Sequence, residues 1–180
     1  WQLKRSGFDG LVITGKSEKP VILVIDADQI TFRESGDLWG TDVFIADERL
    51  KTEIDPKGVT SLIGPAGERL VKVASISHDG RHTRSAGRCG MGAVMGSKKL
   101  KAIVITGDRE IKLANPEEAK KLGAEGYKDV LSKTGYKSWK AQGTMSTIVW
   151  SQTHGVLPTM NYKESVFDKA DTISGDTMER

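Results

Sequence analysis

The residues best suited to chemistry lie in one glycine-rich, basic segment, residues 84–101. Two arginines, Arg84 and Arg88, stand four residues apart in it, and the glycine between them, Gly87, has no Cβ to hold a ligand away from the backbone. Guanidinium groups donate paired hydrogen bonds to phosphate oxygens, and backbone N–H groups of glycine-rich turns donate to the same oxygens. The segment therefore predicts a site for a ligand that carries phosphate.

The positive charge of the chain is concentrated around this segment. Residues 80–107 contain no Asp or Glu, and they hold six cations, which are Arg81, Arg84, Arg88, Lys98, Lys99 and Lys101. The whole chain has a formal net charge of only +3, so the residues outside this window are net negative. Lysines elsewhere are typical of a solvated surface. The window therefore favours an anionic ligand.

Three other chemical candidates are weaker. His78 and His82 have the spacing of zinc ligands on a helix, but Asp79 and Gly80 lie between them and disfavour one, so we interpret both as loop or surface histidines. Cys89 lacks a visible base partner for nucleophilic chemistry. One cysteine also cannot build an iron–sulfur site, which needs several thiolates.

A dinucleotide-binding fold is an alternative reading of the glycines. Gly90, Gly92 and Gly96 follow the Rossmann pattern with one residue too many in the last interval, and Asp108 and Glu110 stand near the expected acidic position. The preceding segments, however, read as an antiparallel meander rather than a strand–helix–strand unit. We therefore favour a phosphate site on a different fold.

The segments that must position these residues read as short strands and one helix. The apolar and β-branched runs predict strands at residues 21–25, 29–34, 59–63, 70–76 and 100–106. The pattern at residues 41–50 predicts a helix with Phe44, Ile45 and Leu50 on one side and a solvated acidic face that includes Asp47. The glycine-rich segment then connects the strands at 70–76 and 100–106, with a short helix at residues 93–97.

The character of the chain changes near residue 112. Asn115, Pro116 and Glu118 are typical of a helix start, and the helix is predicted to run to about Thr134, with Gly135 able to end it. We expect an α+β fold with two parts. Residues 1–110 form a strand-rich, cofactor-binding N-terminal domain with a mixed or antiparallel sheet, and residues 111–180 begin an α-helical domain.

Bulk composition excludes several classes of protein. The chain has 180 residues, of which 37% are hydrophobic and 28% charged, as in ordinary globular domains. A single cysteine fits a reducing, cytoplasmic compartment, and no apolar run approaches the roughly 20 residues of a membrane span. The chain begins with Trp1 rather than Met, which indicates a fragment of a longer protein. The sequence leaves open whether the protein is a homo-oligomer.

The long segment RSAGRCGMGAVMGSKKLKAI, residues 84–103, closely resembles the signature of the tungsten-containing aldehyde:ferredoxin oxidoreductase family. Shorter segments are similar to the family in the same order, at residues 3–16, 38–40, 63–68 and 155–161. The resemblance covers nearly the whole chain, and the central motif is its specific part.

This resemblance implies an oxidoreductase that oxidises aldehydes to carboxylic acids and passes the electrons to ferredoxin. Family members hold tungsten between the dithiolenes of two pyranopterins, magnesium bridges the pterin phosphates, and a four-iron cluster lies close by. Related tungsten subunits of benzoyl-CoA-reducing enzymes belong to the same broad family, so the substrate, an aldehyde or an acyl compound, stays open. The choice between tungsten and molybdenum stays open as well.

By the same resemblance, the cofactor-binding residues are Arg84, Ser85, Ala86, Gly87 and Arg88, and the backbone carbonyl of Ser85 ligates magnesium. The family often has a small residue at the position of Cys89, so no special role is expected for this thiol. The cysteines of the four-iron cluster and the acid/base residues are expected outside residues 1–180. The fragment alone is therefore predicted to be inactive, and the cluster is not ligated by it.

A binding module without catalysis is the rival interpretation. A cluster of cations and glycines would also suit a phosphate-ligand or nucleic-acid-binding domain, whose binding would weaken with salt and need no metal. The four tryptophans are scattered and do not alternate with basic residues as in proteins that stack nucleic-acid bases. We therefore expect no nucleic-acid partner and no membrane partner.

Overall fold

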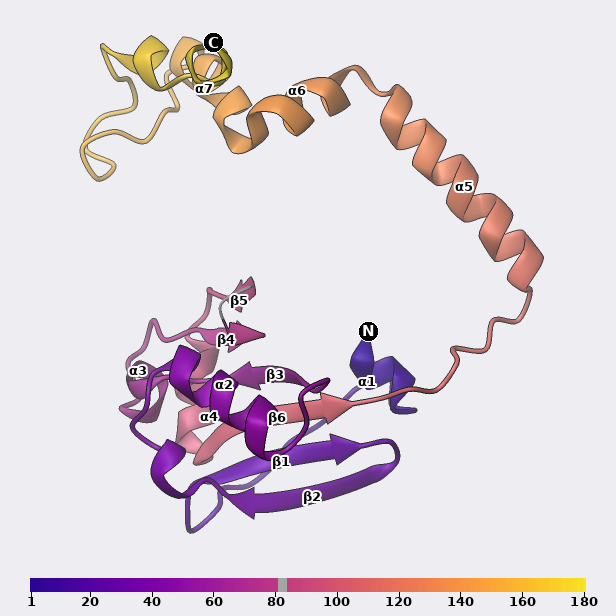
Figure 1. Cartoon of the computed structure of the whole chain (residues 1–180). Coiled ribbons are helices and arrows are strands. Elements are labelled where there is room, and N and C mark those ends of the chain that lie inside the picture. Colours follow the sequence, from indigo (N-terminus) through magenta and orange to yellow (C-terminus); the bar gives the residue numbers. More distant parts are fainter. Residues whose placement is uncertain (81–83) are drawn as a thin grey trace. The chain divides into compact units, whose positions relative to one another are not determined.

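The computed structural model describes residues 1–80 and 84–180, which form two compact units, Trp1–Ile111 and Lys112–Arg180 (Figure 1). The first unit is built around a sheet, and the second is helical. No helix in the described ranges has both the length and the apolar character that crossing a membrane requires.

The strands of the first unit form a six-stranded mixed sheet in the order β2-β1-β6-β3-β4-β5, counted over the described residues. Their bounds are β1 Val21–Asp26, β2 Gln29–Glu34, β3 Val59–Leu62, β4 Ile76–His78, β5 Arg84–Ala86 and β6 Leu100–Thr106. The neighbours β1 and β6 run parallel, and the other paired strands run antiparallel. The expected α+β fold with a mixed sheet is therefore confirmed, and β1–β2 is an antiparallel hairpin.

One predicted strand is largely wrong. Of the predicted strand at 70–76 only its last residue, Ile76, pairs in the sheet, as the first residue of β4. Leu70 has a positive φ of 60°, and its N–H donates to the carbonyl of Gly67, which turns the chain away from an extended path. Val73 is 81% exposed, so the apolar residues of this segment mark a turn rather than a buried strand.

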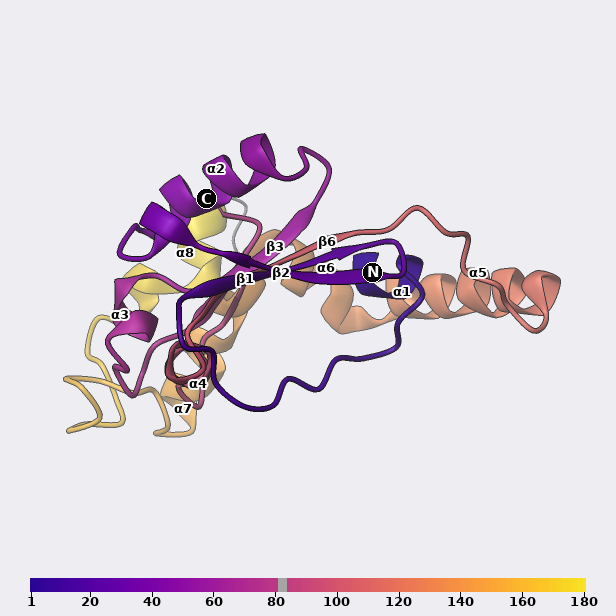
Figure 2. The same cartoon turned by 90° about the horizontal axis from the view of Figure 1, so that it is seen from below.

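Two apolar clusters cover the two faces of the sheet, and Figure 2 shows helices α2 (Val43–Glu53) and α4 (Met91–Ser97) on opposite sides of it. The α2 face contains Ile22, Val24, Leu38, Ala46, Leu50, Leu62, Ala102 and Val104. The α4 face contains Leu23, Ile25, Ile63, Met95 and Leu100. Strand β1 contributes alternate residues to both clusters and is therefore central to the fold.

The predicted helix at 41–50 is confirmed as α2, but of the three apolar residues expected on one side only Leu50 is buried. Phe44 and Ile45 are 47% and 49% exposed, whereas Asp47 and Leu50 are buried. The Asp47 carboxylate accepts a hydrogen bond from the Thr60 hydroxyl in β3, which satisfies it inside the fold. The interpretation of Asp47 as part of a solvated face was therefore wrong.

The second unit contains short helices and turns. These are α5 Pro116–Ser132, α6 Thr134–Gln142, α7 Ile148–Thr153 and α8 Gly175–Glu179, with 3-10 turns at Gly143–Thr147 and Ala170–Ile173. Asn115 caps α5 as predicted, because its side-chain oxygen accepts from the Glu118 N–H at 3.2 Å. Gly135 does not end a helix, since α5 stops at Ser132 and Gly135 lies inside α6.

Other helical elements of the first unit are α1 (Gln2–Arg5), a 3-10 turn (Gly36–Leu38) and α3 (Pro65–Glu68). The last residue of α3, Glu68, forms a buried ion pair. Lys101 of β6 has no exposed surface, and its Nζ donates to Glu68 Oε1 at 2.5 Å and to the Thr41 carbonyl at 2.9 Å. Glu68 Oε2 accepts from the Gly40 N–H at 2.8 Å. The pair therefore ties β6, α3 and the segment before α2 together.

A register shift in β6 explains how a lysine enters the core. Val21 pairs with Leu100, whereas the next residue, Ile22, pairs with Ala102, so Lys101 is an extra residue in the strand. Such a bulge re-aims a side chain that regular alternation would point elsewhere.

We predict that Lys101→Met destabilises the chain by roughly 3–5 kcal/mol, because it leaves the Glu68 carboxylate buried without its partner. The double variant Lys101→Met/Glu68→Leu should recover most of that loss, since no buried charge remains. Lys19→Met, which breaks the exposed pair between Lys19 and Glu34, should change stability little and serves as the control. Urea unfolding followed by circular dichroism measures all three. Equal effects of Lys101→Met and Lys19→Met would contradict the prediction.

Candidate functional site

The predicted cofactor-binding residues lie at one edge of the sheet. Arg84, Ser85 and Ala86 form β5, which pairs with β4, and Gly87 and Arg88 belong to the turn that leads from β5 into α4. Sequence analysis did not foresee β5 and took the whole motif as a connection. The candidate site therefore consists of an edge strand followed directly by a turn.

Two other residues of the basic, acid-free window were considered as candidates. Arg81 and His82 lie outside the described residues.

Ser85, whose backbone carbonyl is the expected magnesium ligand, is exposed on β5. Among residues 1–80 and 84–180, His, Cys, Asp and Glu side chains form no group of three or more that could hold a metal ion.

Arg84 and Arg88 are exposed, and neither guanidinium forms an ion pair with a carboxylate of the described part of the chain. Arginine carries its charge at all physiological pH values, and its planar fork matches two oxygens of a phosphate. These two side chains therefore fit an anionic ligand that comes from outside the described residues.

The lysines of the window have other partners. Lys98 Nζ donates to the Gly15 carbonyl at 3.2 Å, and Lys99 Nζ donates to the Glu18 carbonyl at 2.5 Å. Lys101 is the buried partner of Glu68. The three lysines thus hold the fold together. The sequence predicted that all the cations of the window face one ligand. Because the three lysines have partners within the fold, only the arginines of β5 and of the turn after it remain as candidates among the described residues.

The four glycines of the segment also divide into two kinds. A Cβ added at Gly87 would meet nothing within 4 Å, so the backbone there is open to a ligand. A Cβ at Gly90 would lie 2.0 Å from the Lys72 carbonyl oxygen, and one at Gly96 would lie 2.0 Å from that of Gly67. A Cβ at Gly92 would lie 2.4 Å from the Ser75 carbonyl oxygen. These three glycines allow backbone to pack on backbone and do not face a ligand.

The short helix expected at residues 93–97 is present as α4, Met91–Ser97. Its start is held beside the segment that precedes β4, because the Gly92 N–H donates to the Ala74 carbonyl at 2.9 Å. Cys89 is exposed and has a φ of 65°, which is followed by a φ of 65° at Gly90. This pair of left-handed residues reverses the chain between the arginine turn and α4.

The sequence suggested that His78 is a loop or surface residue, and the structure shows that it does not lie in a loop. It lies in β4, is partly buried, and its Nδ1 is 2.8 Å from the Ser61 Oγ of β3. Sequence analysis missed this pair because the two residues are far apart in the chain. It also missed the pairing of Lys101 with Glu68, although a lone lysine within the apolar run of β6 was a visible signal.

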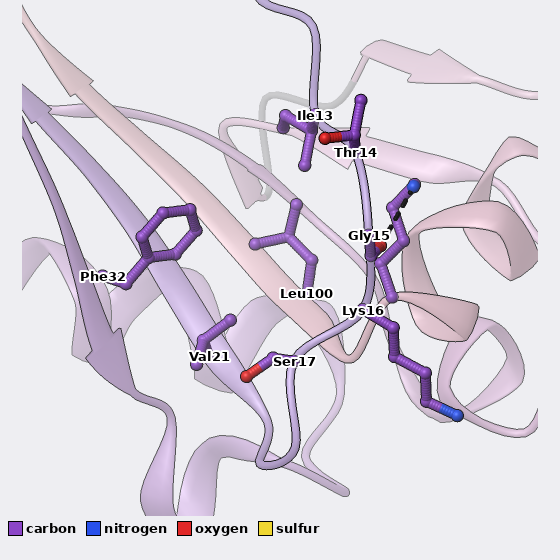
Figure 3. Close-up of a pocket in the computed structure, with 9 residues that line it drawn as sticks. Ile13, Thr14, Gly15, Lys16, Ser17, Val21, Phe32 and Leu100 are labelled. Atoms are coloured by element: carbon purple, nitrogen blue, oxygen red, sulfur yellow. Dashed lines mark hydrogen bonds between the residues drawn. The ribbon is translucent and has the colours of Figure 1, made fainter.

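A separate apolar cavity of about 310 Å³ lies between residues 13–17 and the sheet (Figure 3). Its apolar lining comes from Ile13, Val21, Phe32 and Leu100, and the dashed line in Figure 3 marks the hydrogen bond from Lys98 to Gly15. No residue of the motif at 84–88 lines it. The cavity is therefore distinct from the candidate anion site.

Comparison with known protein families gives two matches. Residues 1–107 match the model of the aldehyde ferredoxin oxidoreductase N-terminal domain, and residues 121–180 match that of domains 2 and 3 of aldehyde ferredoxin oxidoreductase. Together the two matches account for most of the chain, and only residues 108–120, which lie between them, belong to neither.

Individual relatives agree with these matches. The tungsten-containing aldehyde ferredoxin oxidoreductases of Thermococcus kodakarensis and Pyrococcus furiosus are 37% and 35% identical, each over 98% of this chain and 29% of the relative. An aliphatic sulfonate oxidoreductase, WOR-like subunit, of Pyrococcus furiosus is 34% identical over 77% of this chain and 24% of its own length. The chain thus spans less than a third of the length of these relatives.

Solved structures also match this chain, and one of them is a reductase complex. A chain of the active site complex of benzoyl coenzyme A reductase, solved in complex with 1,5-dienoyl-CoA, superimposes with a TM-score of 0.62 at 32% identity. The match covers 88% of this chain and 21% of that chain.

We predict that Gly96→Ala destabilises the chain by roughly 1–3 kcal/mol, because the added methyl group would overlap the Gly67 carbonyl and force α4 away from α3. The matched control is Gly123→Ala in α5, where a Cβ meets nothing within 4 Å. This control should raise stability by about 0.5–1 kcal/mol, since alanine favours an exposed helix interior. Urea unfolding curves compare the two variants, and a stable Gly96→Ala chain would contradict the packing described here.

Proposed function

The chain belongs to the aldehyde ferredoxin oxidoreductase family, and we propose that it forms part of a tungsten-pterin oxidoreductase that oxidises aldehydes to carboxylic acids with ferredoxin as electron acceptor. Residues 1–110 are then part of the pterin-cofactor-binding N-terminal domain, and residues 111–180 are the start of the helical domain. The relatives are named for this activity as whole proteins, and this chain spans 29% of their length. The activity is therefore proposed for the whole protein to which the chain belongs.

The observation that supports this function most directly is the state of the two arginines. Arg84 and Arg88 are exposed, lack carboxylate partners within the described residues, and flank Gly87, whose backbone is open. A pterin cofactor of this family carries phosphate groups, and phosphate suits both the paired guanidinium donors and a backbone without a Cβ. The residues present therefore fit the anionic part of the cofactor.

Each residue of the motif has a role in this proposal. Arg84 and Arg88 bind and orient the phosphates and neutralise their charge, while Gly87 permits close approach of the backbone. Ala86 places the turn at the end of β5, and the Ser85 carbonyl would hold the magnesium ion that accompanies the phosphates. When bound, the tungsten-pterin group supplies the two-electron chemistry, and the protein supplies binding and orientation.

Other cofactors and partners follow from the same premise. The chain has one cysteine, so we propose that the four-iron cluster is ligated by residues outside this chain. Ferredoxin is the proposed electron partner, and a cytoplasmic location is consistent with such a partner. No catalytic acid or base is assigned to residues 1–180.

A second candidate is the tungsten subunit of a benzoyl-CoA-reductase-like enzyme. The match to the benzoyl coenzyme A reductase complex supports it, at 32% identity over 88% of this chain. Both candidates place a metal–pterin group on the same arginine motif, and they differ in the substrate, which is an aldehyde in one and an acyl thioester in the other. Assays of the intact protein with both substrate classes distinguish them. A non-catalytic phosphate or nucleic-acid binder is the remaining alternative and would contain neither metal nor pterin.

We predict that the double variant Arg84→Gln/Arg88→Gln of the full-length protein retains at least about tenfold less tungsten and pterin, because hydrogen bonds between charged groups are lost at both positions. The matched control, Arg33→Gln/Arg69→Gln, removes the same net charge from two exposed arginines of the same unit. It should leave the content unchanged.

Elemental analysis and fluorescence of the released, oxidised pterin measure the content per polypeptide. If the wild-type protein contains no tungsten, molybdenum or pterin, the proposed function is wrong. If the protein is loaded but the double variant matches the control, the arginines are not the binding residues.

A further inference from the structure

A row of side chains crosses four neighbouring strands and ends at the first arginine of the motif. Ile103 of β6 pairs with Ser61 of β3, Ser61 pairs with His78 of β4, and His78 pairs with Arg84 of β5. Directly paired residues of antiparallel strands point to the same face of a sheet. The four side chains therefore lie side by side on one face, from the core outward to the exposed edge.

This face is the one that carries α4. Ile103 packs against the apolar cluster that contains Met95 of α4, so its row points to that side. Thr60, the neighbour of Ser61, instead donates to Asp47 of α2 on the opposite side, as strand alternation requires. His78 therefore shares a sheet face with Arg84 and with the helix that follows the arginine turn.

The imidazole of His78 is held in place by Ser61. Ser61 Oγ lies 2.8 Å from His78 Nδ1, and both residues are only partly buried. When Nδ1 accepts a hydrogen bond from the Ser61 hydroxyl, the proton of a neutral imidazole resides on Nε2, which is then a hydrogen-bond donor. Ser61 thus holds the ring, and in this tautomer Nε2 is the donor left for another partner.

We infer that His78 is a further binding residue of the anion site, which donates from Nε2 to an oxygen of the phosphate held by Arg84. Ser61 is its positioning residue. The inference rests on the proposed function, because it assigns to the same phosphate a donor from the adjacent strand. A site formed by Arg84 and Arg88 alone would rely on two flexible side chains, whereas an imidazole on β4, fixed by a hydrogen bond, adds a rigid donor beside them.

The test uses the full-length protein and measures how fast tungsten and pterin are released at raised temperature, together with their initial content. His78→Phe keeps a ring of similar size and removes both nitrogens. We expect release to be about tenfold faster than in the wild type, as for loss of a hydrogen bond to a charged group. Ser61→Ala should speed release about threefold, since the ring loses its orientation but keeps its donor.

The control is His154→Phe, which makes the same substitution at an exposed histidine whose Nδ1 also has a partner, the Trp150 carbonyl at 2.7 Å. It should release the cofactor at the wild-type rate. His78→Gln provides a second variant if His78→Phe folds poorly, because its amide N–H₂ is a donor, and it should restore at least half of the lost retention.

If Ser61 acts through His78, Ser61→Ala has no further effect on release in a His78→Phe background, and the double variant matches the single one. A merely structural role for the Ser61–His78 pair would instead appear as a general loss of packing. Circular dichroism and the melting temperature of the cofactor-free protein measure that loss.

The outcomes separate this inference from the function on which it rests. Wild-type protein without tungsten, molybdenum or pterin overturns the proposed function and the inference with it. Wild-type protein that is loaded, and that loses cofactor on Arg84→Gln but releases it within twofold of the wild-type rate on His78→Phe, overturns the role of His78 alone.

Discussion

Close packing of the α4 backbone on its neighbours is the constraint that positions the candidate site. Gly90 and Gly92 press against the carbonyls of residues 72–75, and Gly96 presses against α3. Strand β5 is only three residues long, so its place depends on β4 on one side and on the turn into α4 on the other. A helix held this close leaves little freedom to the turn that carries Arg88, so the backbone at both arginines is fixed at the sheet edge, while their side chains stay free to move.

Residues of the same charge serve opposite purposes within one short stretch of chain. Lys101 is fully buried, and its ammonium group is satisfied by Glu68 and by the Thr41 carbonyl. Arg84 and Arg88 are exposed and have no such carboxylate among the described residues. Burial is costly for a charge unless it is paired, so Lys101 contributes to the fold, whereas the arginines keep their charge for a ligand. The division depends on partners brought by the fold rather than on residue type.

The sequence predicts the regular parts of this fold better than the irregular ones. Strand β1, the β1–β2 hairpin, β6 and the capped start of α5 follow from local apolar patterns and capping residues. The strand predicted at 70–76 was wrong, because Leu70 adopts a left-handed conformation that turns the chain. The β-branched residues that follow it had indicated a strand instead. At the candidate site, charge and glycine content single out the arginines and Gly87, and their role stays a prediction. The Ser61–His78 contact and the true role of Gly90, Gly92 and Gly96 could not be predicted from the sequence, since both depend on which distant backbone lies beside them.

The central place of β6 has a consequence for how the protein is made. It is the last strand along the described chain, yet it lies between β1 and β3 and pairs with both. Until residue 106 has left the ribosome, β1 and β3 each expose an unpaired edge, and the two halves of the sheet have nothing to join them. Contacts of this sequence separation form slowly. The sheet can therefore close only after the last of its strands has been synthesised, and until then its open edges can pair with other chains.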